Sequence, residues 1–452
     1  MLLIEMRSRA SSMLASISAS HGRAAAVILT TAGAALSLVF LLARARRAEL
    51  EKLTDDEARR LPPLLPVVDL DLLVNLGDFR WAAELRLPAS TWAYFSAPAG
   101  DGSTAARNER VVRDCLVLRP RVLVDVSRAT SRATLFGKPT NAPFGIAPTA
   151  FHGLAHADGE EATARAAAAV GVVYCVSGSS SRTVTQIAEA APRGRRLFQM
   201  YLRESRAENE ATLKAAKDSG AECIVLTVDR PRLGVRDALR RFGATFSLPG
   251  RDPLDANAVV GGGSPLSANV TWADVEWLRA AASPVPIAVK GIMDAGDGAK
   301  AVAAGCAAVW VSNHAGRQLD GGASTAEVLP AIVRAVRAAE IERDRERLLR
   351  SKGGGSGISA ARANVRTEVW VDCGVRRGSD VVKLIALGAD FVWLGAPVVW
   401  GLAVAGKEGV ERVLMLLNDE IVNAIALLGV QDVKGIGAHH VSWATGDRPL
   451  PS

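Results

Sequence analysis

The chain has 452 residues, of which 49% are hydrophobic and 22% are charged, and its formal net charge is +7. This length accommodates two or three average domains, or one large barrel with extensions, and the apolar fraction is sufficient for a large core. The basic excess comes mainly from residues 1–60 and 340–366, so the rest of the chain is close to neutral. Because a nucleic-acid-binding protein needs a basic face on its folded part, we exclude nucleic acid as a partner.

The cysteines predict neither a disulfide framework nor a metal site. Their number is odd, five, and no Cys-x-x-Cys pair occurs. We expect free, mostly buried thiols in a reducing compartment. The five are Cys115, Cys175, Cys223, Cys306 and Cys373.

The N-terminal region precedes the predicted folded domain. Residues 24–43 are 20 uncharged, mostly apolar positions, which as a helix would span about 30 Å, the thickness of a bilayer core. Residues 1–23 are rich in serine and carry three arginines and one glutamate, a composition typical of an organelle-targeting leader. The segment 24–43 is a candidate transmembrane anchor, a cleaved targeting or sorting signal, or an ordinary terminal helix. We expect membrane association through residues 24–43, and the leader makes the mitochondrion a candidate location. A peroxisomal location is not supported, because Leu450-Pro451-Ser452 is not the Ser-Lys-Leu address.

A charged and then proline-rich stretch, residues 44–66, predicts a linker, and residues 67–100 predict a helical extension. Beyond it, short apolar runs alternate with helical patterns. Apolar runs without polar alternation are typical of parallel strands buried on both faces. Eight such units predict an α/β fold, a (β/α)8 TIM barrel, with a doubly wound open sheet as the alternative. The predicted strands are Phe144–Pro148, Val172–Ser177, Leu197–Tyr201, Cys223–Val228, Pro286–Lys290, Ala308–Asn313, Val369–Gly374 and Phe391–Gly395.

Two long loops interrupt the alternation. Residues 243–270 follow the fourth strand, where a barrel keeps its active-site loops, and predict a lid. Residues 340–366 are charged and then glycine-rich, and predict a disordered insertion at the opposite end. Residues 401–428 predict one or two closing helices, so that the barrel domain covers 67–446 and leaves a tail, 447–452. The predicted helices of the barrel lie at 158–169, 182–191, 205–219, 272–282, 294–304, 324–339 and 378–387.

Polar or glycine residues end all eight predicted strands, at the end where a barrel places its active site. Thr149, Ser177, Gln199 and Thr227 are neutral hydrogen-bonding residues suited to the edge of a heterocycle. Lys290 is a lone cation that predicts either a structural ion pair or a charge that stabilises an anionic, reduced cofactor ring. Glycines and basic residues after the last two strands match a barrel phosphate site.

The loop Ser312–Asp320 carries an imidazole, His314, and a guanidinium, Arg317, three residues apart. An imidazole moves protons near neutral pH, and a guanidinium clamps a carboxylate. Asp229 could orient and stabilise the imidazolium, and Arg236 supplies a second cation. This set indicates proton removal from a small acid; a surface loop with solvated side chains is the alternative for the loop alone.

Several motifs follow one another in one order: Ala147–Ala150, His156–Glu160 with Ala162–Arg165, Gln199–Tyr201, Leu226–Gly234, Val289–Gly291, Ser312–Asp320 and Asp372–Gly378. In them the sequence resembles the FMN-dependent α-hydroxy acid oxidase/dehydrogenase family, of the glycolate oxidase and flavin-dependent lactate dehydrogenase type. The resemblance covers roughly residues 68–446, apart from 340–366. It implies oxidation of an (S)-2-hydroxy acid to a 2-oxo acid, with the flavin reoxidised by O2, giving hydrogen peroxide, or by another acceptor. It also implies a homo-oligomer, a tetramer or larger.

The resemblance implies a role for each site residue and no metal. His314 is the catalytic base and Asp229 pairs with it. Tyr201 binds the substrate hydroxyl, whereas the substrate carboxylate is bound by Tyr94, Arg236 and Arg317. The implied FMN-binding residues are Pro148, Thr149, Ala150, Ser177, Gln199, Thr227, Lys290, Ser312, Asp372, Cys373, Gly374, Arg376 and Gly395.

Four positions depart from the family pattern. Ala396 replaces an arginine that would bind the FMN phosphate, and Cys373 replaces a glycine of the phosphate loop. Ser179 replaces a tryptophan over the substrate, which implies a roomier pocket, and Pro98 replaces a glycine near Tyr94. Two alternatives to an active hydroxy acid oxidase remain: a membrane-tethered FMN- or carboxylate-binding relative with little or no turnover, and an FMN barrel that acts on another substrate.

Overall fold

The computed structural model describes residues 69–241, 264–352 and 366–444. The predicted leader, candidate membrane segment and linker, most of the predicted lid, and the tail lie outside these residues. Within these three ranges, no helix is long and apolar enough to span a membrane. The described part belongs to one compact unit, Val67–Ser452.

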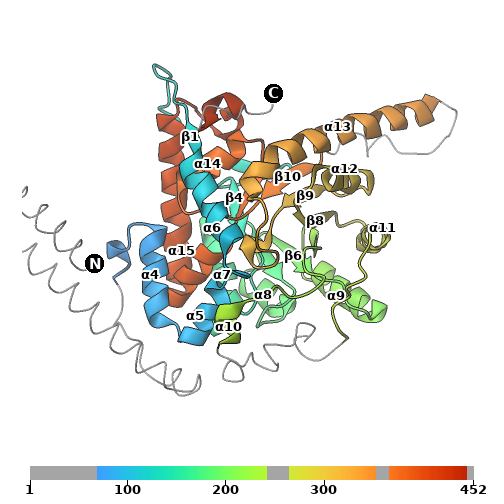
Figure 1. The fold of residues 1–452 in the computed structure, drawn as a ribbon, viewed down its shortest axis with the longest axis horizontal. Coiled ribbons are helices and arrows are strands. Elements are labelled where there is room, and N and C mark those ends of the chain that lie inside the picture. The colour runs from blue at the N-terminus through green and yellow to red at the C-terminus, as the bar shows by residue number, and fades with distance from the viewer. Residues whose placement is uncertain (1–68, 242–263, 353–365, 445–452) are drawn as a thin grey trace, which may run out of the picture. The chain divides into compact units, whose positions relative to one another are not determined.

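Eight parallel strands close into a barrel in the order β10-β11-β4-β5-β6-β7-β8-β9 (Figure 1). The predicted TIM barrel is confirmed and the open sheet is excluded, because β11 pairs with β4 and closes the ring. Each predicted strand is present, with small differences at its ends. The strands are β4 (Phe144–Ile146), β5 (Tyr174–Ser177), β6 (Arg196–Met200), β7 (Ile224–Thr227), β8 (Ile287–Ile292), β9 (Ala308–Val311), β10 (Glu368–Val371) and β11 (Phe391–Leu394).

Side chains of the strands alternate between two cores. Outward residues such as Leu226 and Val289 pack against the surrounding helices, whereas inward residues fill the barrel. Three inward tryptophans dominate the interior: Trp310 stacks on Trp393 with ring centroids 4.5 Å apart, and Trp370 lies 5.2 Å from Trp393. The barrel interior is therefore a packed core, and chemistry is confined to the strand ends.

Helices surround the barrel, as predicted from the alternating pattern (Figure 1). Their starts follow local capping rules: Asn75 caps α4 with its side chain, and the Ser205 hydroxyl accepts a hydrogen bond from the Glu208 amide at the start of α9. The predicted closing helices form one element, α15, with a kink at Ala405 and Gly406. The helices are α4 (Leu76–Arg86), α5 (Ala89–Ser96), α6 (Ser103–Arg110), α7 (Gly159–Val170), α8 (Val184–Ala190), α9 (Arg206–Asp218), α10 (Asp237–Arg240), α11 (Trp272–Ala282), α12 (Ala295–Ala303), α13 (Thr325–Lys352), α14 (Gly378–Ala386) and α15 (Ala396–Leu427).

The prediction that disorder begins at residue 340 is wrong, because α13 continues to Lys352. Glu340 is buried and accepts a hydrogen bond from the backbone amide of Thr367. Arg337 donates to Glu340 and to Asp390, both at 2.8 Å, and so ties the helix to the barrel. The charged run is the solvated surface of a helix, whose end extends past its neighbours in Figure 1. The predicted disorder of 353–365 lies outside the described residues.

Two small antiparallel sheets were not predicted. One is a hairpin, β2–β3, whose turn residue Phe136 has a φ of 52° and a ring centroid 5.3 Å from that of Trp370. The backbone amide of Phe136 donates to the side chain of Glu368, the first residue of β10, at 2.7 Å. The hairpin therefore covers the barrel end opposite the site. The paired strands are β2 (Ala133–Leu135) with β3 (Lys138–Thr140), and β1 (Leu116–Leu118) with β12 (Val441–Trp443).

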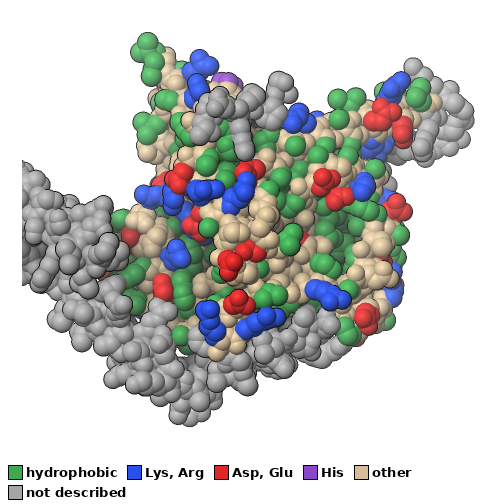
Figure 2. Space-filling model, in the orientation of Figure 1, with side chains coloured by type: hydrophobic (Ala, Val, Ile, Leu, Met, Phe, Trp, Pro, Cys, Tyr) green, Lys and Arg blue, Asp and Glu red, His purple; other side chains and the backbone are tan. Residues whose placement is uncertain are grey.

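Charge is mixed over the surface. On the face shown in Figure 2, acidic side chains lie among the basic ones. This face therefore lacks the continuous basic area that nucleic acid binding requires.

Candidate active site

One cavity opens at the carboxyl ends of the strands and gathers nearly all predicted site residues. Asp229 and Ser312 are the two that do not line it: the Ser312 residue is fully buried, and Asp229 lies behind His314. The predicted residues that line the cavity are Tyr94, Pro148, Thr149, Ala150, Ser177, Gln199, Tyr201, Thr227, Arg236, Lys290, His314, Arg317, Asp372, Cys373, Gly374, Arg376 and Gly395.

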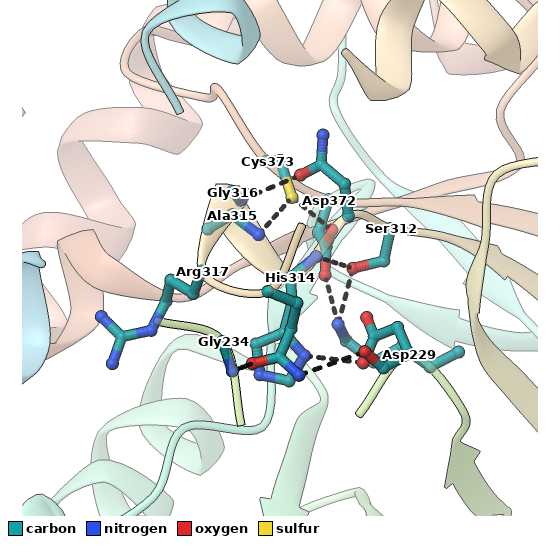
Figure 3. Close-up of polar contacts among 12 residues, drawn as sticks. Asp229, Gly234, Ser312, His314, Ala315, Gly316, Arg317, Asp372 and Cys373 are labelled. Carbon is teal, nitrogen blue, oxygen red and sulfur yellow. Dashed lines mark hydrogen bonds and ion pairs between the residues drawn. The ribbon is translucent and has the colours of Figure 1, made fainter. Parts of the chain in front are cut away.

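His314 and Asp229 form a hydrogen-bonded pair between the ends of β9 and β7 (Figure 3). The distance from His314 Nδ1 to Asp229 Oδ1 is 2.8 Å. Burial lowers the pKa of His314, while Asp229 acts in the opposite direction. Burial alone would raise the pKa of Asp229, but its interaction with the His314 ring and then the charge of Lys290 outweigh burial and lower that pKa. The pair is thus a carboxylate beside a neutral imidazole, and a proton on Nδ1 leaves Nε2 as the acceptor.

Of the two predicted carboxylate-binding arginines, Arg236 is buried and Arg317 is partly buried, and neither has an acidic partner in the described part of the chain. Arg317 donates to the backbone carbonyls of Tyr94 at 2.7 Å and of Phe95 at 2.8 Å, which ties the His314 loop to α5. Arg236 makes two long hydrogen bonds of 3.4 Å, to the Arg317 carbonyl and to Gln318 Oε1. Burial, followed by repulsion from Arg317, lowers the pKa of Arg236 to about 9. Two neighbouring cations without an acidic partner, one buried and one partly buried, favour a bound anion.

Neutral polar groups at the ends of β6 and β7 lack partners within the described residues. Gln199 accepts hydrogen bonds from Ser177 Oγ at 3.4 Å and from the Gly178 amide at 3.3 Å, but its Nε2 is buried and unpaired. The Thr227 hydroxyl is also buried and unpaired. Because buried polar groups in native proteins are nearly always hydrogen-bonded, these atoms indicate a polar ligand in the cavity.

Lys290 lies beside these groups. Its Nζ donates to Ser312 Oγ at 2.7 Å and is 3.0 Å from Asp372 Oδ2. Burial opposes its charge, but Asp372 and then Asp229 raise the pKa above the usual value. The buried ammonium is therefore retained at neutral pH and carries charge into the cavity.

The phosphate end is built from β10, β11 and the start of α15. Gly374 has a φ of 83°, and a Cβ there would lie 2.4 Å from the carbonyl oxygen of Asn108, so only glycine fits. Gly395 precedes the first turn of α15, whose amides have no side-chain cap. Arg376 is the cation at this end, and its Nη2 donates to Glu109 Oε1 at 2.7 Å. Ala396 adds no charge.

Cys373 has its side chain turned toward the His314 loop. Its φ of 78° is unusual for a residue other than glycine. The thiol donates to Asp372 Oδ1 at 2.7 Å and accepts a hydrogen bond from the Ala315 amide at 3.1 Å. Burial raises the pKa of this thiol well above its usual value, so it remains protonated.

Several lining residues were not predicted as site residues. The Arg230 guanidinium lies 5.2 Å from the ring centroid of Tyr201. Phe151 has a φ of 58°, and its ring centroid lies 5.9 Å from that of Tyr94. Arg230 and Leu233 stand inside the Leu226–Gly234 motif, which could have indicated both, whereas Phe151 lies outside all the motifs. The further lining residues are Phe95, Ala147, Ser179, Leu233, Leu239, Ala315, Val375, Trp393, Leu394, Ala396, Pro397 and Val399.

These residues fit FMN. The unpaired Gln199 and Thr227 atoms suit a heterocycle edge, Lys290 suits an anionic ring, and the glycines with Arg376 and the start of α15 suit a phosphate. A (β/α)8 barrel with this site and a base beside two arginines that lack an acidic partner among the described residues is a flavin-dependent hydroxy acid oxidoreductase.

The comparisons with known proteins agree. Residues 83–443 match the FMN-dependent dehydrogenase family, and the chain belongs to it. A peroxisomal (S)-2-hydroxyacid oxidase of Arabidopsis thaliana is 37% identical over 82% of this chain and 97% of that protein. An L-lactate oxidase of Nostoc sp. is 36% identical over 80% of this chain and 96% of that protein. A crystal structure of mandelate oxidase, 34% identical, superimposes with a TM-score of 0.70 over 82% of this chain and 99% of that one.

Proposed function

We propose that this protein oxidises an (S)-2-hydroxy acid to a 2-oxo acid with FMN. The observation that carries the proposal is the convergence, in one cavity, of the His314–Asp229 pair with Arg236 and Arg317. The base can take a proton only from a group that the two cations hold nearby, and their charge selects a carboxylate.

Each residue then has a defined task. Arg236 and Arg317 bind the substrate carboxylate with help from Tyr94, and Tyr201 binds the hydroxyl. The Nε2 atom of His314 accepts the proton, and Asp229 stabilises the imidazolium that forms. When bound, FMN supplies the acceptor for the two electrons that leave the substrate α-carbon.

The cofactor is held by groups that the chain itself provides. Gln199, Thr227 and Lys290 bind the edge of the ring, while Arg376 and the amides at the start of α15 hold the phosphate. Ser177, with its neighbours at the ends of β4 and β5, lines the same wall.

Replacing the base gives the direct test. His314→Ala should bind FMN and remain yellow, but anaerobic bleaching by a 2-hydroxy acid should slow by about 100- to 10,000-fold. His439→Ala, outside the cavity, is the matched control and should bleach normally. A variant that bleaches at the normal rate would refute the assignment of His314. A wild-type protein that does not bind added FMN would instead support the alternative of a membrane-tethered, carboxylate-binding relative with little or no turnover.

We further propose a substrate larger than glycolate, because Ser179 lines the cavity where the family pattern has tryptophan. Ser179→Trp should lower kcat/KM for a 2-hydroxy acid with a phenyl or long alkyl side chain much more than for glycolate. One methylene more or less in a hydrophobic pocket changes the discrimination between two substrates by about 1–3 kcal/mol, and an indole is far larger than one methylene. Ser179→Ala is the control. Equal losses for both substrates would contradict the proposed size preference.

We propose O2 as the electron acceptor. Oxygen consumption with equimolar hydrogen peroxide would support it, whereas turnover that requires a quinone or cytochrome would contradict it. A homo-oligomer, a tetramer or larger, is also proposed, and light scattering at working concentration tests it. A monomeric mass would contradict this assembly.

We propose that residues 24–43 associate the protein with a membrane, and that residues 1–23 direct it to mitochondria. The support is the uncharged length of the first segment and the arginine- and serine-rich composition of the second. Fractionation with alkaline carbonate extraction tests both. Full release into the supernatant of a protein that still contains residues 24–43 would contradict membrane anchoring.

A further inference from the structure

The loop Ser312–Asp320, which carries His314 and is called the catalytic loop below, has an unusual backbone. His314 and Ala315 have φ angles of 56° and 58°, in the left-handed region that residues other than glycine rarely adopt. Such a conformation persists only where its surroundings hold it. The imidazole is carried on this backbone, so whatever holds the loop also sets the position of the base.

Two side chains hold the two amides of this segment (Figure 3). The His314 amide donates to Ser312 Oγ at 3.1 Å, and the Ala315 amide donates to Cys373 Sγ at 3.1 Å. Ser312 belongs to the same loop, but Cys373 comes from the end of β10. The thiol is therefore the acceptor that ties this turn to another strand.

The two acceptors are joined behind the loop. Ser312 Oγ accepts from Lys290 Nζ at 2.7 Å, and Lys290 is paired with Asp372 Oδ2 at 3.0 Å. The other carboxylate oxygen, Asp372 Oδ1, accepts from Cys373 Sγ at 2.7 Å. The network is closed: it runs from the Ala315 amide through the Cys373 thiol, the Asp372 carboxylate, the Lys290 ammonium and the Ser312 hydroxyl to the His314 amide. The buried Lys290–Asp372 pair is the part of the network most distant from the loop in this series of bonds.

The backbone at Cys373 does not itself call for a cysteine. At a φ of 78°, glycine is less strained than any residue with a Cβ. What the side chain adds is one donor to Asp372 and one acceptor for Ala315, and a thiol can be both.

We propose that Cys373 is a positioning residue for His314: its thiol connects the left-handed turn of the catalytic loop to the Lys290–Asp372 pair. The position of the base and the charge at the cofactor edge are then set by one network. This inference rests on the proposed function for its effect on rate, but the contact itself concerns the loop alone.

Three substitutions at position 373 separate this role from backbone strain. In the flavin-loaded enzyme, Cys373→Ala and Cys373→Gly should slow anaerobic flavin reduction about 10- to 100-fold, the loss expected from a base displaced by about 1 Å. The substrate Kd should change little, because the arginines are untouched. Cys373→Ser should restore most of the rate, since a hydroxyl both donates and accepts. Cys306→Ala, a buried thiol far from the cavity, is the control.

Two further readouts do not depend on turnover. Amide hydrogen exchange over residues 312–317 should be faster in the alanine and glycine variants and normal in the serine variant. In urea, the glycine variant should unfold at the same or a higher concentration than the alanine variant, because glycine relieves the left-handed strain. A slow but stable glycine variant therefore excludes misfolding as the cause.

The outcomes are distinct. Unchanged exchange over 312–317 in the alanine and glycine variants would overturn the proposal, whatever the activity. Wild-type reduction rates in both variants, or a serine variant as slow as they are, would also overturn it. Failure of the wild-type enzyme to reduce its flavin with any 2-hydroxy acid would instead refute the proposed function, and the exchange data would still decide the role of Cys373.

Discussion

The partnership of Asp229 with His314 yields a quantitative prediction. Asp229→Asn keeps the size of the side chain but removes the charge that faces the imidazole at 2.8 Å. The two side chains are only 12% and 23% exposed, so water screens the interaction weakly. A hydrogen bond to a charged group is worth about 1.5–3 kcal/mol, and each 1.4 kcal/mol in the barrier changes the rate about tenfold. Flavin reduction should therefore slow by about 10- to 150-fold.

The pH dependence gives the same variant a second signature. His314 acts as a base when it is neutral, and burial lowers its pKa while Asp229 opposes the shift. Removing the carboxylate removes that opposition, so the pKa should fall further. In the wild type, the rate of flavin reduction should fall at a pH below about 6.5, the ordinary pKa of histidine. In the variant, this fall should occur at a still lower pH. The slower rate in the plateau then reflects the lost stabilisation of the imidazolium, because the base remains deprotonated there.

Anaerobic stopped-flow at several pH values measures both effects. Asp218→Asn, the same substitution on an exposed carboxylate at the end of α9, is the control and should change neither. Wild-type plateau rates, or an acid limb that moves to higher pH, would show that Asp229 does not act on the imidazole as described.

Three other predictions concern the cofactor and the frame. Ala396→Arg should tighten FMN binding about 10- to 100-fold by adding a charge-assisted bond at the phosphate, and flavin fluorescence titration measures it; an unchanged Kd would place the phosphate elsewhere. Lys290→Met should destabilise the apoprotein by about 3–5 kcal/mol in urea, because it leaves the Asp372 charge buried and unpaired. Since the pKa of Lys290 is raised, this loss should be the same throughout neutral pH and should shrink only above about pH 10. Glu340→Ala should cost about 1–3 kcal/mol by leaving the buried Thr367 amide unpaired, and a neutral result would contradict the anchoring of α13.

The barrel could be predicted because its signal is local and repeated. Each strand is a short apolar run that ends in polar or glycine residues, and eight repeats leave few alternative folds. The hairpin β2–β3 has strands of three residues, Ala133–Leu135 and Lys138–Thr140, which are too short for a pattern. The sequence does not predict the extent of α13, because a charged run followed by glycines is typical of a disordered segment. The helix is held by the contact between Glu340 and Thr367. Thr367 follows the glycine-rich stretch in the sequence, so this contact cannot be read from the charged run itself.

Most site residues could be predicted individually, but their partners could not. The sequence predicts that Arg376 binds the phosphate, and the structure pairs this guanidinium with Glu109 from α6. The sequence predicts that Arg317 binds the substrate, and the structure shows it donating to the backbone carbonyl of Tyr94. Such pairings join segments more than two hundred residues apart, so they depend on the closed barrel and leave no trace in local sequence.

Lys290 shows why two interpretations of one residue need not compete. The sequence allowed either a structural ion pair or a charge for the cofactor, and the structure gives it an ion pair with Asp372 and a bond to Ser312. An ammonium has three N–H donors, so these two contacts leave one donor for an oxygen or nitrogen acceptor in the cavity. The carboxylate raises the pKa of Lys290, and it thereby keeps the third donor in place at every pH where the enzyme would work. The ion pair is therefore a condition for the cofactor role.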